Sequence, residues 1–309
     1  MTLNGILFFP VTPFAGDGTV DVPTLRTHIE ERIADGAGAV FAGCGTGEFN
    51  SLDADEVLLV AQTAVEAAAG RVPVFVGVGG GGTTSRAVLE RLERLGVDGL
   101  LLLPPYLIAG TQAGLAGYVE RVASLTRLGI IVYQRGTMIF DADTALELSR
   151  IPTVIGFKDG VGDLARMQAI VTAIRSSGDD DFMFFNGLPT AEVTMRAYRA
   201  TGVPLYSSAV FAFAPQVALA FHAALQRDDQ DAVETLLREF YLPFVEIRDR
   251  GRGYHVSLVK AAVRAGGRPV GTVRPPITEP ADRDLADLEA LVARVQPVVD
   301  RLRPERVAV

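Results

Sequence analysis

The stretch VFVGVGGGGTTSRAVLERLERLGVDGLLLL, residues 74–103, contains the unit from which most of this chain is built. The apolar run at 74–78 predicts a buried strand, and a helical pattern follows at 85–95. Thr83, Thr84 and Ser85 are candidate caps at the start of that helix. The apolar run at 99–103 predicts a second strand. Because both runs are apolar at consecutive positions, they favour strands of a parallel sheet that is buried on both faces.

The same unit recurs at intervals of roughly 25–35 residues. Strands are expected at 5–10, 39–44, 74–78, 99–103, 130–133, 154–157, 182–185 and 205–208, and helices include 22–34, 54–68, 85–95 and 164–175. Asp53 and Glu56 resemble a capping box before the helix at 54–68. Eight such units within about 225 residues favour an α/β fold of the (β/α)8 TIM-barrel type over an open doubly wound sheet. We expect residues 1–225 to form a catalytic barrel and residues 226–309 to form a C-terminal helical extension packed on it.

Composition excludes several classes of partner. The net charge is −8, so no basic surface is expected for nucleic acid or an anionic membrane. Apolar runs such as 100–103 are far shorter than the roughly 20 residues that cross a bilayer. The start of the sequence, MTLNGILFFPVTPF, is unlike a signal peptide. The single cysteine, Cys44, excludes an intrachain disulfide. We expect a cytoplasmic protein.

Scarcity of histidine and lysine narrows the chemistry. His28, His222 and His255 lie far apart in segments with helical patterns, which disfavours histidine-based nucleophilic catalysis and metal sites. Of the 29 basic residues, only Lys158 and Lys260 are lysines. Arginine stays charged in nearly every setting and cannot act as an amine nucleophile. Amine chemistry would therefore depend on one of two side chains, and no metal is expected.

Lys158 directly follows the predicted strand at 154–157, where active sites of such barrels lie. Loss of solvation there would lower its pKa from about 10.4 and make the amine a nucleophile. The alternative is a lysine that pairs with Asp159. Lys260 lies in the helical segment HVSLVKAAVRA, 255–265, where we expect a structural or solvent-facing role.

Two further groups are expected near this lysine. Tyr133 ends the preceding strand, and a phenol there can move protons during imine formation; the alternative is a packed tyrosine with a satisfied hydroxyl. Gly45, Thr46, Gly47 and Glu48 offer backbone N–H groups for a carboxylate, and Thr46 could pass a proton to Tyr133. The alternative for that loop is a tight turn built from glycine.

The glycine run at 77–82 matches the dinucleotide pattern G-x-G-x-x-G, which raises the alternative of an oxidoreductase. Asp98, the acidic residue about 20 positions further on, precedes a strand, whereas a ribose-binding carboxylate belongs at a strand's far end. The run also lies in the third unit, and no GK[ST] follows it. We therefore expect no nucleotide cofactor.

Six short motifs together resemble a known superfamily. They are FFPVTPF (8–14), CGTGEF (44–49), LLPPY (102–106), IVYQR (131–135), GFKDG (156–160) and VRPP (273–276). Over nearly its whole length the chain resembles the dihydrodipicolinate synthase/N-acetylneuraminate lyase superfamily. The resemblance implies that Lys158 forms an imine with a keto acid, that Tyr133 is the acid/base and that Thr46 belongs to its hydroxyl relay. It also implies a homodimer or homotetramer.

Departures from the synthase pattern favour another branch. Gly45 replaces the first of two consecutive threonines, Leu107 replaces a second tyrosine, and residues 136–139 lack a carboxylate-binding arginine. GTGEF, VGGG, GFKDGVGD, NGLPTAE and YSSAVF resemble the 5-dehydro-4-deoxyglucarate dehydratase branch. This implies decarboxylating dehydration of that keto-deoxy diacid to 2,5-dioxopentanoate without a cofactor. A 2-keto-3-deoxy sugar acid aldolase, and a non-catalytic barrel that only binds a keto acid, remain as alternatives.

An acidic protein that binds a dianion must use local donors. For the carboxylate beside the imine we expect the backbone of Gly45 and Gly47 together with Thr46. The other candidate substrate-binding residues follow later strands: Tyr106, Asn186, Thr190, Ser207 and Ser208. Arg135 is either a cation for the distal carboxylate or part of a surface ion pair.

Overall fold

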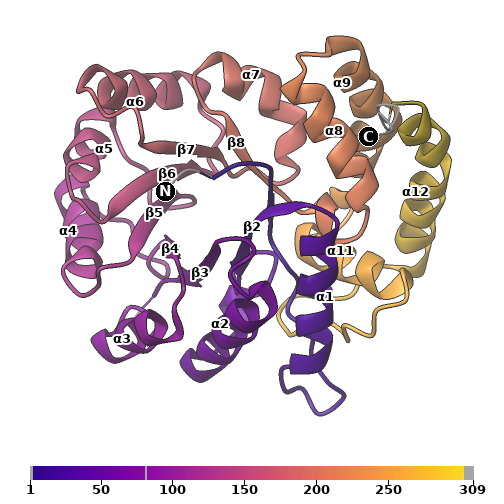
Figure 1. The fold of residues 1–309 in the computed structure, drawn as a ribbon, viewed down its shortest axis with the longest axis horizontal. Coiled ribbons are helices and arrows are strands. Elements are labelled where there is room, and N and C mark those ends of the chain that lie inside the picture. The colour runs from indigo at the N-terminus through magenta and orange to yellow at the C-terminus, as the bar shows by residue number, and fades with distance from the viewer. Residues whose placement is uncertain (1–2, 81, 303–309) are drawn as a thin grey trace.

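The computed structural model describes residues 3–80 and 82–302, so Gly81 of the glycine run and the outer ends of both expected segments lie outside the described residues. Eight parallel strands close into a barrel in which each strand pairs with the next and β8 pairs with β1 (Figure 1). The strands are β1 (Ile6–Phe8), β2 (Ala37–Ala42), β3 (Val74–Val78), β4 (Gly99–Leu102), β5 (Gly129–Gln134), β6 (Val154–Asp159), β7 (Met183–Asn186) and β8 (Leu205–Ser208). The prediction of a (β/α)8 barrel is confirmed.

Helices alternate with the strands and surround them. They are α1 (Val22–Ala34), α2 (Ala54–Ala68), α3 (Arg86–Leu95), α4 (Gln112–Ala123), α5 (Ala142–Ser149), α6 (Leu164–Ser176), α7 (Met195–Ala200) and α8 (Pro215–Gln226). The expected capping box before α2 is present: Asp53 Oδ1 accepts from the Glu56 N–H at 2.8 Å, and the Glu56 carboxylate accepts from the Asp53 N–H at 3.1 Å.

The expected side-chain cap of α3 is wrong. Ser85 occupies the N-cap position without a side-chain hydrogen bond to the helix. The hydroxyls of Thr83 and Thr84 donate instead to the carbonyls of Gly79 and Gly80, both at 2.6 Å. These threonines therefore close the loop after β3 rather than start the helix, because a hydroxyl can bond a nearby backbone carbonyl as readily as a helix N–H.

Strand bounds differ from the predicted ones mainly at the ends that carry chemistry. β6 continues through Lys158 and Asp159, and β5 continues through Gln134, so that Tyr133 pairs with Lys158 across the two strands. The expected strand at 39–44 lies two residues earlier, which places Cys44 beyond the end of β2. Polar residues can extend β5 and β6 because strands pair through backbone N–H and C=O groups, which does not depend on the polarity of the side chain.

The barrel interior is a packed core. The rings of Phe9, Phe41 and Phe75 stack in a row, with centroids 4.6 Å and 4.8 Å apart. Leu101, Ile131, Met183 and Phe185 are buried in the same cluster. Side chains thus fill the barrel up to its C-terminal end, as they do in TIM barrels generally.

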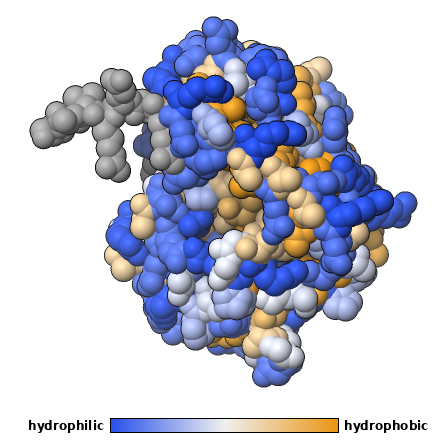
Figure 2. All heavy atoms as spheres, turned by 90° about the vertical axis from the view of Figure 1, so that its right-hand side faces the viewer, coloured by the Kyte–Doolittle hydropathy of each residue, from blue (hydrophilic) through white to orange (hydrophobic). Residues whose placement is uncertain are grey.

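The extension begins after α8. It comprises α9 (Gln230–Leu236), a π-helical turn at Leu237–Tyr241, α10 (Leu242–Arg248), α11 (Tyr254–Ala265) and α12 (Asp282–Leu302). α12 packs against α8, α10 and α11 on the right of Figure 1. Seen from that side, the surface is mostly hydrophilic, with apolar residues gathered around a hollow near the middle (Figure 2). Within the described residues, no helix has the length and apolar character that crossing a membrane requires.

Candidate active site

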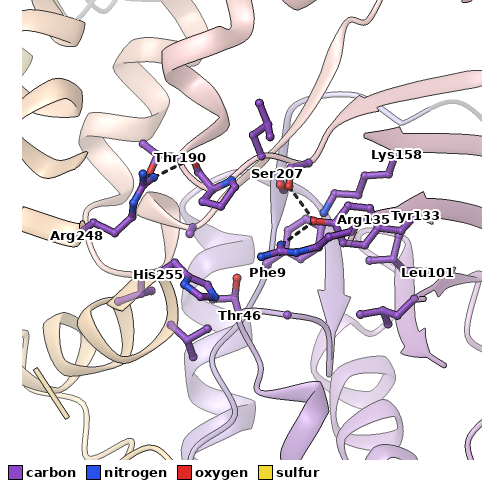
Figure 3. A pocket seen from close by; sticks show the side chains of 18 of the residues that line it. Phe9, Thr46, Leu101, Tyr133, Arg135, Lys158, Thr190, Ser207, Arg248 and His255 are labelled. Carbon is purple, nitrogen blue, oxygen red and sulfur yellow. Dashed lines mark hydrogen bonds between the residues drawn. The ribbon is translucent and has the colours of Figure 1, made fainter. Parts of the chain in front are cut away.

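A cavity of about 240 Å³ lies at the C-terminal end of the barrel. A cavity of this size suits a small substrate. Lys158, Tyr133, Arg135, Thr46, Gly45, Thr190 and Ser207 line it from the barrel side, and Phe244, Arg248, His255, Val256 and Val259 line it from the extension. Figure 3 shows the two groups facing one another across the space.

Lys158 enters the cavity because side chains alternate along β6. Phe157 packs outward against Phe140, so its neighbour points into the barrel. The Lys158 side chain is buried, and its Nζ lies 4.4 Å from the ring centroid of Phe9 and 4.3 Å from that of Tyr133. Burial lowers the pKa of Lys158 from its ordinary value, and Arg135 acts in the same direction, while Tyr133 and Cys44 oppose the shift. The site therefore favours the neutral amine more than water does.

The alternative of a Lys158–Asp159 ion pair is wrong. Asp159 points to the other face of β6, where its Oδ1 accepts from Gln134 Nε2 at 2.6 Å and its Oδ2 accepts from the Tyr198 hydroxyl. The backbone N–H groups of Val161 and Gly162 also donate to it, both at 3.1 Å. In the described part of the chain, no ion pair or hydrogen bond involves the Lys158 amine. Asp159 thus fixes the turn after β6 and leaves the amine to the cavity.

Tyr133 is held beside the lysine by two hydrogen bonds. Its hydroxyl donates to the Gly187 carbonyl at 2.9 Å and accepts from Arg135 Nη1 at 3.0 Å (Figure 3). A Cβ at Gly187 would lie 2.8 Å from both Lys158 Cε and Tyr133 Cε2, so glycine is what allows these three groups to meet. Thr46 lines the same cavity, but the expected Thr46–Tyr133 hydrogen bond is not among those of the described residues.

Arg135 belongs to the cavity and not to the surface. Its guanidinium points to the phenol, and none of the ion pairs between described residues includes it. The alternative of a surface ion pair is therefore wrong. Because Arg135 is already bonded beside Lys158, it lies on the catalytic side of the cavity.

The loop after β2 reaches the cavity with part of its length. Gly45 and Thr46 line the cavity, but Gly47 does not. The Gly47 carbonyl accepts from the Thr12 hydroxyl at 2.7 Å, and a Cβ there would lie 3.1 Å from Pro10 O. Close packing against the chain after β1 therefore favours a glycine at position 47, and binding of substrate by its backbone N–H stays a prediction.

Glu48 connects this loop to the C-terminal extension. It has a left-handed backbone, with φ of 57°, and its carboxylate bonds Lys260 Nζ at 2.7 Å and the Arg274 N–H at 2.8 Å. Both charged side chains of the pair are fully buried. Lys260 is therefore structural, as one of the two expectations had it, and the solvent-facing alternative is wrong because α11 packs against the barrel.

Replacing Lys260 with methionine is expected to destabilise the fold by about 3–5 kcal/mol, because it leaves the buried Glu48 carboxylate without its partner. Urea unfolding followed by circular dichroism measures this. The double variant Glu48→Gln/Lys260→Met removes both charges and should lose less stability than Lys260→Met alone. A single variant as stable as the wild type would contradict the structural role.

Three other expected substrate-binding residues do not reach the cavity. Asn186 Nδ2 donates to Ala191 O at 3.0 Å and to Thr194 Oγ1 at 2.7 Å. The Ser208 hydroxyl donates to Glu192 Oε1 at 2.6 Å. Both side chains lie on the outward face of their strands, whereas the neighbouring residue of each strand points into the barrel. The expectation that they bind substrate is therefore wrong. Tyr106 is 79% exposed on the loop after β4 and lies outside the cavity of this chain.

Sequence reasoning missed Arg248 and His255, which line the cavity from the extension. The available signal was the segment RDRGRGYH, 248–255, where arginines and glycines gather before a helix. The pKa of His255 is lowered by burial, and Arg135 and Arg248 add to the shift. Nearby positive charge thus disfavours the charged form of the His255 imidazole.

Residues 2–295 match the model of the dihydrodipicolinate synthetase family, and the chain belongs to this family. It is 53% identical over 290 residues to a probable 5-dehydro-4-deoxyglucarate dehydratase 2 of Streptomyces avermitilis, covering 94% of this chain and 86% of that protein. It is 49% identical over 298 residues to a probable 5-dehydro-4-deoxyglucarate dehydratase 1 of Streptomyces coelicolor, covering 96% and 94%. Among solved structures, the dihydrodipicolinate synthase of Oceanobacillus iheyensis superposes with a TM-score of 0.85 at 24% identity, covering 93% of this chain and 95% of that one.

Proposed function

We propose that this chain is a class I, Schiff-base-forming lyase. Its substrate in this proposal is 5-dehydro-4-deoxyglucarate, and its products are 2,5-dioxopentanoate, carbon dioxide and water. The names of the Streptomyces relatives support the substrate. The observation that carries the chemistry is the Lys158 amine, which is buried at the cavity floor with a lowered pKa and faces the phenol of Tyr133.

The first half of the reaction forms the imine. The neutral Lys158 Nζ attacks the C5 ketone, and the carbinolamine loses its hydroxyl as water with a proton from Tyr133. The Gly187 carbonyl and Arg135 hold the phenol in place for this transfer. Thr46 and the backbone of Gly45 lie in the same cavity, and we propose that they bind the C6 carboxylate beside the imine.

The second half uses the imine nitrogen as an electron sink, and we propose that no metal or cofactor is needed. Loss of a C4 proton gives an enamine, which expels the C3 hydroxyl as water. The C1–C2 bond then breaks, carbon dioxide leaves, and its electron pair passes through C2, C3 and C4 to the imine nitrogen. Protonation and hydrolysis release 2,5-dioxopentanoate and regenerate Lys158.

Borohydride reduction in the presence of 5-dehydro-4-deoxyglucarate tests this proposal. The expected result is a stable adduct on the peptide that contains Lys158, together with carbon dioxide release in the unreduced reaction. Release of pyruvate without carbon dioxide would assign the site to a 2-keto-3-deoxy sugar acid aldolase. An adduct without any turnover would leave a barrel that only binds keto acids, and an adduct at another residue would contradict the mechanism.

The division of the chain and the cellular compartment are also part of this proposal. We propose that residues 1–225 are the catalytic barrel and residues 226–309 an extension that completes the cavity. The arginine, histidine and apolar side chains that α10 and α11 contribute to the cavity wall support this division. We propose that the reaction takes place in the cytoplasm. The net charge of −8 supports this, because it does not favour binding to an anionic membrane surface.

We also propose that the chain assembles as a homodimer or homotetramer through the loop after β4. Tyr106, Leu107 and Ile108 are 79%, 77% and 63% exposed, and three consecutive large apolar side chains in solvent mark an interaction surface.

Leu107→Asp with Ile108→Asp is expected to halve the mass measured by light scattering, because carboxylates buried in the interface would lack partners. Leu59→Asp, at a single exposed leucine on α2, is the control, and an unchanged mass in the loop variant would refute this interface.

A further inference from the structure

Two polar side chains of the extension face the catalytic lysine across the cavity. Arg248 is the last residue of α10, and His255 lies in the first turn of α11. Both line the cavity, and Figure 3 shows them on the side opposite Lys158 and Tyr133. The imine mechanism uses neither of them, so their presence in the wall needs another account.

The Arg248 guanidinium is fixed in place. Its side chain is only 13% exposed, and its Nη1 donates to Pro189 O at 2.9 Å and to Thr190 Oγ1 at 2.7 Å. Its Nε pairs with Asp249 at 2.8 Å, but Asp249 is 59% exposed, and water screens that pair. Among the described residues, Nη2 has no hydrogen-bond partner. A carboxylate is recognised well by a guanidinium that is fixed in position and still has N–H donors free.

The position of this cation decides which carboxylate it meets. In a 2-keto acid, the carboxylate next to the ketone stays one bond from the carbon that joins Lys158, so it must lie on the barrel side of the cavity. Arg135 is on that side and already donates to Tyr133. Only a second, distal carboxylate can extend toward the extension, and a protein with a net charge of −8 needs a local cation to hold it.

We infer that Arg248, with His255 beside it, binds the distal carboxylate of a dicarboxylic 2-keto acid, so that the C-terminal extension selects diacids over monoacids. This inference rests on the proposed imine at Lys158 and adds a residue that determines specificity. His255 lines the cavity beside the guanidinium and offers a hydrogen bond to the same carboxylate. Thr190 connects the two sides, because its hydroxyl accepts from Arg248 while it lines the same wall.

A matched pair of probes isolates the distal group. 2-Oxoadipate has the six-carbon skeleton of the proposed substrate with both hydroxyls removed, and 2-oxohexanoate has a methyl group in place of its distal carboxylate. Neither carries a hydroxyl to eliminate, so both stop at the imine, which borohydride reduces to a stable adduct. The concentration that half-saturates adduct formation, measured by intact-protein mass spectrometry, reports binding of each acid.

The wild-type protein is expected to favour 2-oxoadipate over 2-oxohexanoate by about 10- to 100-fold, the range for a charge-assisted hydrogen bond. Arg248→Gln should remove most of this preference and leave the half-saturation for 2-oxohexanoate unchanged. Arg248→Lys should restore part of it. Arg252→Gln is the matched control: this arginine is exposed, does not line the cavity and should keep the full preference.

The outcomes separate this inference from the function on which it rests. If Arg248→Gln weakens both acids equally, or leaves the preference intact, Arg248 does not read the distal carboxylate and the inference is overturned. If the wild-type protein forms no Lys158 adduct with either acid, the proposed imine chemistry itself fails, and the diacid site falls with it.

Discussion

Lys158→Arg is expected to lower the turnover of 5-dehydro-4-deoxyglucarate by at least about 10⁴-fold, the scale seen when a covalent nucleophile is removed. Arginine keeps a positive charge and a long side chain but cannot form an imine, because its guanidinium stays protonated. The measurement is carbon dioxide release, with borohydride trapping as a second readout. Lys158→Met controls for the charge: it should be equally inactive and at least as stable as the wild type, because it removes a buried amine that burial disfavours. Turnover within tenfold of the wild type in either variant would end the Schiff-base assignment.

The pH dependence of the wild-type enzyme reports the same amine. Burial lowers the pKa of Lys158 below its ordinary value of 10.5. The attacking form is the neutral amine, so kcat/KM should rise with pH through this lowered pKa and level off above it. The rising limb should therefore lie below pH 10.5. A limb at or above that value would mean that the charged form is stabilised in the cavity, against the structural argument.

The positions of Lys158 and Tyr133 could be predicted from the sequence. Each comes at the carboxyl end of an apolar run, and in a (β/α)8 barrel the carboxyl ends of all strands meet at the active-site face. The sequence could not say which of Ser207 and Ser208 points inward, because strands buried on both faces show no alternation of apolar and polar residues. The structure shows Ser207 in the cavity wall and Ser208 bonded to Glu192 behind it. The same lack of alternation misplaced Asn186.

Arg248 and His255 were out of reach for a different reason. They lie roughly 90–100 residues beyond Lys158 on helices of the extension, and helical periodicity tells which face is buried but not which barrel loop that face meets. Only the packing of α10 and α11 over the barrel mouth brings them into the wall. Lys260 illustrates the same limit, since its partner Glu48 is 212 positions away in the chain.

Tyr133→Phe is expected to lower kcat by about 10²- to 10⁴-fold, the usual contribution of a positioned acid or base. The ring stays, so the contact with Lys158 and the packing of the barrel mouth are kept, and only the hydroxyl between Gly187 and Arg135 is lost. Because the lysine remains, borohydride should still trap an adduct at Lys158, more slowly than in the wild type. Rapid-quench measurements of adduct formation and of carbon dioxide release separate the two steps.

Thr46→Val distinguishes proton transfer by Tyr133 from a general effect of polarity in the cavity. Thr46 lines the same space, but the hydroxyl of Tyr133 is bonded to Gly187 and Arg135 instead. Thr46→Val should therefore raise KM, through weaker binding of the carboxylate beside the imine, and lower kcat much less than Tyr133→Phe does. Equal losses of kcat in the two single variants, with no further loss in the double variant, would instead show that the two hydroxyls act as one relay once substrate is bound. Wild-type kcat in Tyr133→Phe would remove the phenol from the mechanism altogether and leave water as the proton carrier.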